Sequence, residues 1–274
     1  MYVDIVDLRD FYATGLGQLA RRLLVRRLRR FWPDLADKTV VGLGYAGPYL
    51  GIFREEAERT LVFMPAAQGV VNWPSDGPSS AALVDEAELP LGDGTVDRML
   101  LVHCLEMSER PAELLREVWR VLAPGGRLGV LVPNRRGLWA RFEHTPFGHG
   151  RPFSRGQLVR LLRDTMFTPS AWGEGLWVPP FRGRFMLRSA AAWERAGTVL
   201  RAMPSGVLFV EATKQLYQAL PARERSRGRV RLVPALAGEP VSRQRAGVTR
   251  ISDPSGTIRA ALAGASPSER AADE

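Results

Sequence analysis

Cysteine and lysine are unusually scarce in this 274-residue chain. Its one cysteine, Cys104, has no partner for a disulfide within the chain, and a single cysteine excludes a metal site built from several of them. Cys104 lies in an apolar stretch, which is typical of a buried thiol. Only Lys38 and Lys214 are lysines, so the net charge of +9 comes almost entirely from arginine.

Long apolar runs are also absent. No stretch reaches the roughly eighteen apolar residues of a membrane-spanning helix. The first ten residues contain Asp4, Asp7 and Asp10 in place of the basic and then apolar segment of a secretory signal. We therefore expect a soluble, cytoplasmic protein. With 45% hydrophobic residues, the chain is long enough for one α/β domain with a full core plus extensions.

The positive charge is concentrated at the two ends of the chain. Residues 1–36 hold seven Arg and four Asp, and residues 221–274 hold ten Arg and six acidic residues. Residues 15–32 predict an amphipathic helix, with Arg22, Arg26, Arg29 and Arg30 on its polar face. This face suits a phosphate backbone, but no aromatic residues are interleaved, so a solvated surface is the simpler interpretation. An acidic macromolecule or a protein partner is the partner class that this charge favours.

Composition divides the chain into three parts. Residues 1–36 form a basic helical segment, residues 37–220 form the main domain, and residues 221–274 are rich in Gly, Ser, Pro, Ala and Arg. The last part has little apolar periodicity and buries too little surface to offset its ordering entropy. We therefore predict a mostly disordered tail there.

A glycine loop lies at the centre of the main domain. Residues 38–51 read KTVVGLGYAGPYLG, in which β-branched residues suit a buried strand and Gly42, Gly44 and Gly47 suit a tight turn or a close approach to a ligand. A helix beginning at Pro48 would aim its first amides at this loop. The pattern G-x-G-x-x-G indicates a nucleotide-like cofactor, although an ordinary strand-to-helix turn can have the same spacing.

A second stretch, LVDEAELPLGDGTVDRMLLVHCLEMSERPAELLREVWRVLAPGGRLGVLVPN at residues 83–134, adds a more specific signal. It has an acidic residue before Leu-Pro, a Val-Asp strand and an Arg-Val-Leu-Ala-Pro-Gly-Gly turn, in that order. The stretch closely resembles the second half of the cofactor domain in class I S-adenosylmethionine-dependent methyltransferases of the methyltransferase type 11-like group. The resemblance extends over residues 11–214.

This resemblance implies a fold, a cofactor and a set of binding residues. The implied fold is a three-layer α/β/α Rossmann-like sandwich with a seven-stranded, mostly parallel sheet whose last strand is antiparallel. The implied cofactor is S-adenosylmethionine, and Asp85 corresponds to the residue that accepts a hydrogen bond from the adenine amine. The implied cofactor-binding positions are Gly42, Gly44, Tyr45, Gly47, Met64, Asp85 and Glu86.

Two positions depart from the family pattern. The family has an acidic residue at the end of the second strand, where it binds the ribose hydroxyls, and this chain has Met64 followed by Pro65. The family also has an acidic residue at the position of Gly42. In family register the loop glycines become Gly44, Ala46 and Pro48, so the loop itself is degenerate.

Three histidines are the candidate residues for catalysis and acceptor binding. His103 directly follows the predicted central strand at residues 96–102, where cofactor and acceptor would meet, and we predict it as the catalytic residue, although a lone histidine is more often structural. His144 and His149 lie in the predicted loop at residues 133–152, where acceptor recognition would reside. Their spacing lacks a third ligand, so we predict no metal site.

Local patterns predict the remaining elements. The predicted helices are 15–32, 48–58, one beginning at Ser108 or Glu109, 154–163 and 185–203, and the predicted strands are 38–43, 59–64, 81–84, 96–102, 127–132, 167–172 and 207–213.

Three functions remain in view. The first is an S-adenosylmethionine-dependent methyltransferase acting on an unidentified acceptor. The second is a methyltransferase-like pseudoenzyme or partner-binding subunit, because the loop and the Met64 position are degenerate. The third is a nicotinamide dehydrogenase, whose glycine loop matches formally but whose acidic residue about twenty positions later is absent.

Overall fold

The computed structural model describes residues 2–181, 183–200 and 204–216. These described residues belong to one compact unit. The tail predicted at residues 221–274 lies outside the described residues.

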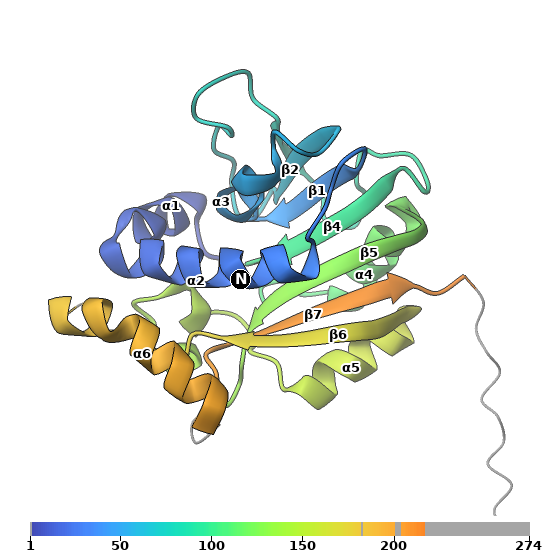
Figure 1. Cartoon of the computed structure of the whole chain (residues 1–274). Helices are drawn as coiled ribbons and strands as arrows, with labels where there is room; N and C mark the ends of the chain where they lie inside the picture. Colours follow the sequence, from blue (N-terminus) through green and yellow to red (C-terminus); the bar gives the residue numbers. More distant parts are fainter. Residues whose placement is uncertain (1, 182, 201–203, 217–274) are drawn as a thin grey trace, which may run out of the picture. The chain divides into compact units, whose positions relative to one another are not determined.

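A seven-stranded sheet forms the middle layer of this unit (Figure 1). Its order is β3-β2-β1-β4-β5-β7-β6. The first five strands pair in parallel, and β7 runs antiparallel to both of its neighbours. The predicted fold, including the antiparallel last strand, is therefore confirmed. The strands are β1 (Thr39–Gly44), β2 (Arg59–Pro65), β3 (Ala81–Val84), β4 (Val96–Val102), β5 (Leu122–Pro133), β6 (Phe167–Gly175) and β7 (Val207–Lys214).

Helices cover both faces of the sheet, and each face has its own apolar core. The helices α1 (Ile5–Ala13), α2 (Gly15–Phe31) and α6 (Arg184–Leu200) lie on one face, and α4 (Pro111–Val121) and α5 (Arg155–Asp164) lie on the other (Figure 1). Alternate residues of β1 illustrate the division, since Val40 joins the first core and Val41 the second. Strands buried on both faces explain the nearly continuous apolar sequence of β4.

The N-terminal segment is built into this unit. The predicted helix at residues 15–32 is confirmed as α2, but the helix α1 was missed. Asp4 accepts a hydrogen bond from the Val6 amide at 2.7 Å, which caps α1 at its start. Leu8 and Leu28 are both buried in the core beneath the sheet. Residues 1–36 therefore cover one face of the main domain.

The helix predicted at residues 48–58 is wrong in length. The α3 helix (Gly47–Leu50) is one turn long and continues as a 3₁₀ turn, η1 (Gly51–Phe53). The Glu56 carboxylate, which would have lain on a longer helix, accepts hydrogen bonds from the Leu35 amide and from Arg29. A single helical turn forms few backbone hydrogen bonds. Such tertiary contacts therefore outweigh the tendency of residues 51–58 to continue the helix.

Two further boundaries differ from the prediction. The α4 helix begins at Pro111 rather than at Ser108 or Glu109, because the Ser108 hydroxyl bonds to Glu86 and also accepts from the Arg110 amide. β5 begins at Leu122 and contains the Pro-Gly-Gly sequence as an irregularity in its pairing with β4. By contrast, α5 has the predicted Ser154 cap.

Candidate functional site

The predicted cofactor-binding residues and His103 gather at the carboxyl ends of β1, β2, β3 and β4. Parallel pairing aligns these ends, so Gly44 lies beside Val102, and Pro65 lies beside Val84. This is the edge where open α/β sheets bind ligands.

Close contacts within the protein explain why glycine occupies three positions in and beside the β1–α3 loop. Gly44 has φ +83°, and an added Cβ would lie 2.2 Å from the Val102 carbonyl oxygen. At Gly42 an added Cβ would lie 2.5 Å from the Ala46 Cβ. The Trp73 indole covers Gly47, 2.8 Å from where its Cβ would be. Of these three glycines, only Gly44 needs a left-handed backbone.

Tyrosine side chains cover the same loop. Tyr12 of α1 stacks on Tyr45 with ring centroids 5.3 Å apart. Its hydroxyl lies 2.5 Å from the Tyr49 hydroxyl and 2.8 Å from His103 Nε2. Burial, reinforced by the neighbouring tyrosine, raises the pKa of Tyr12 well above its ordinary value. α1 is thus tied to the loop through one buried hydroxyl.

His103 is completely buried, and its polar atoms are unevenly paired. Its backbone has φ +50°, and its carbonyl accepts from Gln68 Nε2 at 2.9 Å. Its Nδ1 lies 3.4 Å from Glu106 Oε1, outside hydrogen-bond geometry. Among the described residues, this Nδ1 and both Glu106 oxygens have no hydrogen-bond partner. A carboxylate can only accept, so it favours the tautomer with hydrogen on Nδ1, in which Nε2 accepts from Tyr12.

A cavity of about 360 Å³ opens beside Asp85, and we call it the Asp85 cavity. Asp85 Oδ1 accepts from the Ala87 amide at 2.9 Å, which makes a turn and leaves Oδ2 with no partner among the described residues. Glu86 accepts from Ser108 Oγ at 2.6 Å and from the Tyr2 hydroxyl. Burial raises the pKa of Glu86, although the Ser108 hydrogen bond opposes the rise.

Met64 does not line this cavity. It is 1% exposed, and its sulfur accepts a hydrogen bond from the Val71 amide at 3.4 Å. Pro65 and the exposed Ala66 form the cavity wall at the end of β2. The end of β2 therefore contributes no carboxylate to the cavity.

A second cavity, of about 640 Å³, adjoins the first at Tyr2 and Ala67, and we call it the His144 cavity. His144 and His149 both line it, and their Nε2 atoms lie 2.9 and 2.7 Å from backbone carbonyl oxygens. Since a carbonyl can only accept, each Nε2 donates, and in the neutral imidazole the Nδ1 atom is then an acceptor. Among the described residues that line it, three are carboxylates and none is Lys or Arg; the carboxylates are Asp4, Asp7 and Glu143.

Not all predicted site residues reach these cavities. Asp85, Glu86, His144 and His149 line them, whereas the glycines, Tyr45, Met64 and His103 lie beneath side chains of the chain itself. Within the described residues no cluster of three potential metal ligands occurs, and no helix is long and apolar enough to cross a membrane.

Comparison with known proteins identifies the domain. Residues 29–130 match the family model described as a methyltransferase domain. Over these residues the chain is similar to a methyltransferase domain, as the resemblance to class I S-adenosylmethionine-dependent methyltransferases implied. The family match includes the glycine loop and most of residues 83–134, so the resemblance is confirmed and the nicotinamide dehydrogenase interpretation loses its basis.

A short segment of the chain also matches curated relatives. It is 44% identical over 58 residues to a demethylmenaquinone methyltransferase of Chlamydia trachomatis, which covers 21% of this chain and 25% of the relative. The chain thus spans about a quarter of the length of the curated relatives that it matches.

Solved structures resemble the domain over most of its length. A complex between the Haloferax volcanii Trm112 methyltransferase activator and a methyltransferase gives a TM-score of 0.56 at 18% identity, covering 75% of this chain and 94% of that one. The geranyl diphosphate C-methyltransferase of Streptomyces coelicolor A3(2), solved with Mg²⁺, geranyl diphosphate and S-adenosyl-L-homocysteine, gives 0.51 at 15% identity, covering 70% and 76%. At these identities the likeness shows the fold.

Several residues at the site were missed in the sequence. Tyr2 lines both cavities, and Glu106 and Gln68 contact His103 from positions outside any motif. The pattern His-x-x-Glu at residues 103–106 was the available signal, since a turn after β4 brings the two side chains together.

Proposed function

We propose that this protein is an S-adenosylmethionine-dependent methyltransferase that binds the adenosine end of the cofactor in the Asp85 cavity and the acceptor in the His144 cavity. The observation that carries the proposal is the pair of adjoining cavities at the carboxyl edge of a class I methyltransferase sheet. Both volumes lie within the roughly 300–1,000 Å³ of small-molecule sites.

The residues of the Asp85 cavity fit an adenosine group. Asp85 Oδ2 is available to accept from an exocyclic amine, and the exposed Ala66 leaves room at the end of β2. The missing carboxylate at Met64 removes a contact worth about 1.5–3 kcal/mol, roughly a tenfold to hundredfold loss of affinity. We therefore propose weak but real cofactor binding.

The cofactor would supply an electrophilic methyl group for in-line transfer, and the protein would act mainly by alignment and exclusion of water. His103 is fully buried, so its proposed contribution is positional: its Nε2 holds the Tyr12 hydroxyl, and thereby α1, against the β1–α3 loop. The acceptor cavity is lined by Asp4, which caps α1, and by Asp7 and Phe11 within that helix. His103 thus connects the cofactor loop to the acceptor wall.

The proposed acceptor is a neutral or cationic small molecule. Three carboxylates line the His144 cavity, and they would repel an anion. His144 Nδ1 and His149 Nδ1 are proposed as hydrogen-bond acceptors for it. The overall positive charge suggested an acidic macromolecule as a partner. The carboxylates of this cavity argue against such a molecule as the methyl acceptor.

Calorimetric titration with S-adenosylmethionine and S-adenosylhomocysteine tests cofactor binding. Asp85→Ala should weaken binding about tenfold, because the adenine amine would lose its charged hydrogen-bond acceptor. Glu88→Ala is the matched control, since Glu88 is an exposed acid in the same turn and does not line the cavity. It should leave the affinity within about twofold.

Transfer of a labelled methyl group into fractionated extract then tests activity. Absence of heat with both nucleotides at millimolar concentration, from folded protein, would overturn the enzyme proposal. That result would favour the partner-binding subunit.

A further inference from the structure

A third cavity lies away from the Asp85 and His144 cavities, in a groove between α2 and α6. Its volume is about 350 Å³, and its lining includes Arg26, Arg27 and Arg30 of α2 and Glu194 and Arg195 of α6. Figure 1 shows these two helices side by side on the same face of the sheet. Four guanidinium groups therefore surround one carboxylate.

The arginines of α2 fall into two groups. The helix has six arginines and no acidic residue. Three are held in place: Arg21 donates to the Pro48 carbonyl oxygen, Arg27 pairs with Glu194, and Arg29 pairs with Glu56. The other three are exposed and have no hydrogen bond or ion pair among the described residues; they are Arg22, Arg26 and Arg30.

Arg27 forms a fixed floor for the groove. Its guanidinium lies 5.0 Å from the centroid of the Trp177 ring and 3.9 Å from the Glu194 carboxylate. Glu194 is itself fixed, because it accepts from the Trp177 and Val178 amides at 2.7 and 3.3 Å. Burial lowers the pKa of Arg27, and the charge of Arg30 adds to this effect while Glu194 opposes it.

Positively charged side chains outnumber negatively charged ones along the lining of the groove. Glu194 is its single lining carboxylate and is already engaged by Arg27 and two amides. Arg26 and Arg30 are one helical turn apart, where like charges repel. Planar guanidinium groups bind phosphate oxygens in pairs of parallel hydrogen bonds, which a compact ammonium group does not.

We propose that the groove between α2 and α6 binds the phosphate groups of a small phosphorylated ligand, with Arg27 as its fixed contact and Arg26 and Arg30 as contacts that close on it. A small ligand is favoured over a polymer because 350 Å³ is the size of a small-molecule site. This binding is independent of the proposed methyl transfer, since none of these residues lines the Asp85 or His144 cavity.

The probe for this groove is inorganic pyrophosphate, titrated into the full chain by calorimetry at several salt concentrations. The double variant Arg26→Ala with Arg30→Ala should weaken binding about tenfold, because two charge-assisted contacts are lost. Arg22→Ala is the matched control: it is equally exposed, lies on the same helix and is outside the groove. It should change the affinity by less than about twofold, since only distant, screened charge is removed.

Three results would overturn the proposal. One is an equal loss per arginine in the control and the groove variants, which would indicate diffuse attraction to a basic surface. Another is no pyrophosphate binding even at low salt. The third is binding of phosphatidylglycerol vesicles or single-stranded RNA without binding of pyrophosphate, which would identify a macromolecular surface. Circular dichroism of each variant establishes that the fold is kept, and unchanged nucleotide titration separates this result from the methyltransferase proposal.

Discussion

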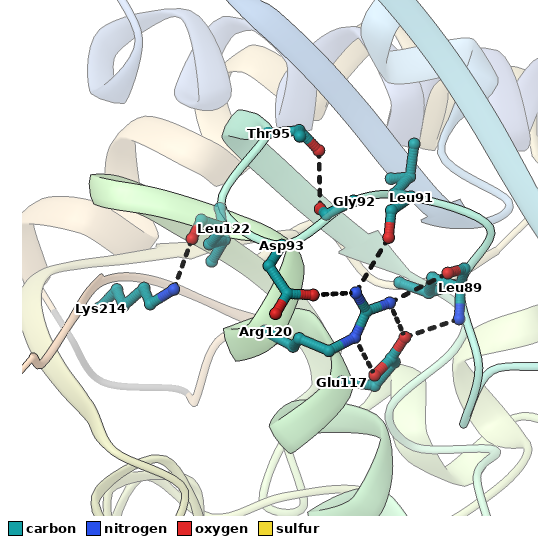
Figure 2. A network of polar contacts seen from close by, with 9 residues as sticks. All are labelled: Leu89, Leu91, Gly92, Asp93, Thr95, Glu117, Arg120, Leu122 and Lys214. Atoms are coloured by element: carbon teal, nitrogen blue, oxygen red, sulfur yellow. Dashed lines mark hydrogen bonds and ion pairs between the residues drawn. The ribbon is translucent and has the colours of Figure 1, made fainter.

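Arg120 and His103 lie near opposite ends of β4. They differ in how many of the polar atoms around them have hydrogen-bond partners. All five N–H donors of Arg120 have acceptors, supplied by Glu117, Asp93 and two backbone carbonyls (Figure 2). Around His103, three buried side-chain atoms have no hydrogen-bond partner within the described structure: His103 Nδ1 and the two Glu106 oxygens.

This difference indicates what each end is built to do. The Arg120 network joins α4 to the loop before β4, and Glu117 also accepts from the Leu89 amide at 2.7 Å. Such a paired network stabilises the fold. An unpaired buried group costs stability, and a functional role is one reason for retaining it. The predictions below test that contrast, beginning with the largest expected effect.

Gly44→Ala should lower the free energy of unfolding by about 3 kcal/mol or more, because its φ of +83° disfavours a side chain and the added Cβ would meet the Val102 carbonyl oxygen. Gly51→Ala is the control, with φ −54° and no atom within 4 Å of its added Cβ. It should stabilise by about 0.5 kcal/mol. Urea denaturation measures both, and equal values would mean that the loop backbone is not constrained as described.

Arg120→Ala should lower the free energy of unfolding by about 2 kcal/mol, because the Leu89 and Leu91 carbonyl oxygens lose their donor; partial exposure of the side chain limits the effect. Arg110→Ala tests the same helix with an exposed pair, Arg110–Glu113, and should cost less than about 0.5 kcal/mol. Thermal denaturation compares them. Similar losses would remove the distinction between a network and a surface ion pair.

Glu106→Gln and Glu117→Gln should change stability in opposite directions by about 1 kcal/mol each. The first replaces a buried carboxylate that has no hydrogen bond among the described residues, so unfolding should become harder. The second weakens hydrogen bonds to Arg120 and the Leu89 amide, so unfolding should become easier. If denaturation showed a loss in both variants, Glu106 would have to be paired in solution.

The pH dependence of stability should also differ in sign between Glu117 and Glu86, by less than about 1 kcal/mol. The Arg120 hydrogen bond lowers the pKa of Glu117, so its stabilisation is present above the ordinary pKa of a glutamate and is lost as pH falls through the lowered value. Burial raises the pKa of Glu86, so its contribution is present at low pH and is lost as pH rises through the raised value.

Denaturation of Glu117→Gln and Glu86→Gln between about pH 3 and pH 7 measures this difference. With rising pH, the deficit of Glu117→Gln should grow, whereas Glu86→Gln should gain stability relative to the unaltered protein. Parallel curves would contradict the opposite environments of the two carboxylates.

Local sequence patterns were sufficient for most of the fold. The β-branched and apolar runs predicted all seven strands, and Ser154 marked the start of α5 because its cap is formed within four residues. Prediction failed where distant contacts decide the outcome, as at Glu56, whose bonds to Leu35 and Arg29 replace a longer helix. α1 was missed although Asp4 caps it. Its apolar residues are explained only by their packing against the core, which the local sequence does not show.

The sequence by itself determined the methyltransferase domain, the mostly parallel seven-stranded sheet with an antiparallel last strand that the resemblance implies, and the line of residues at the carboxyl ends of the strands. Only the tertiary structure decided which of them face a cavity. Asp85 does, whereas Met64 turns into the core and His103 is covered by Tyr12, a residue 91 positions earlier. Strand patterns report alternation between two faces, and they carry no information on which distant side chain fills the space above a strand end.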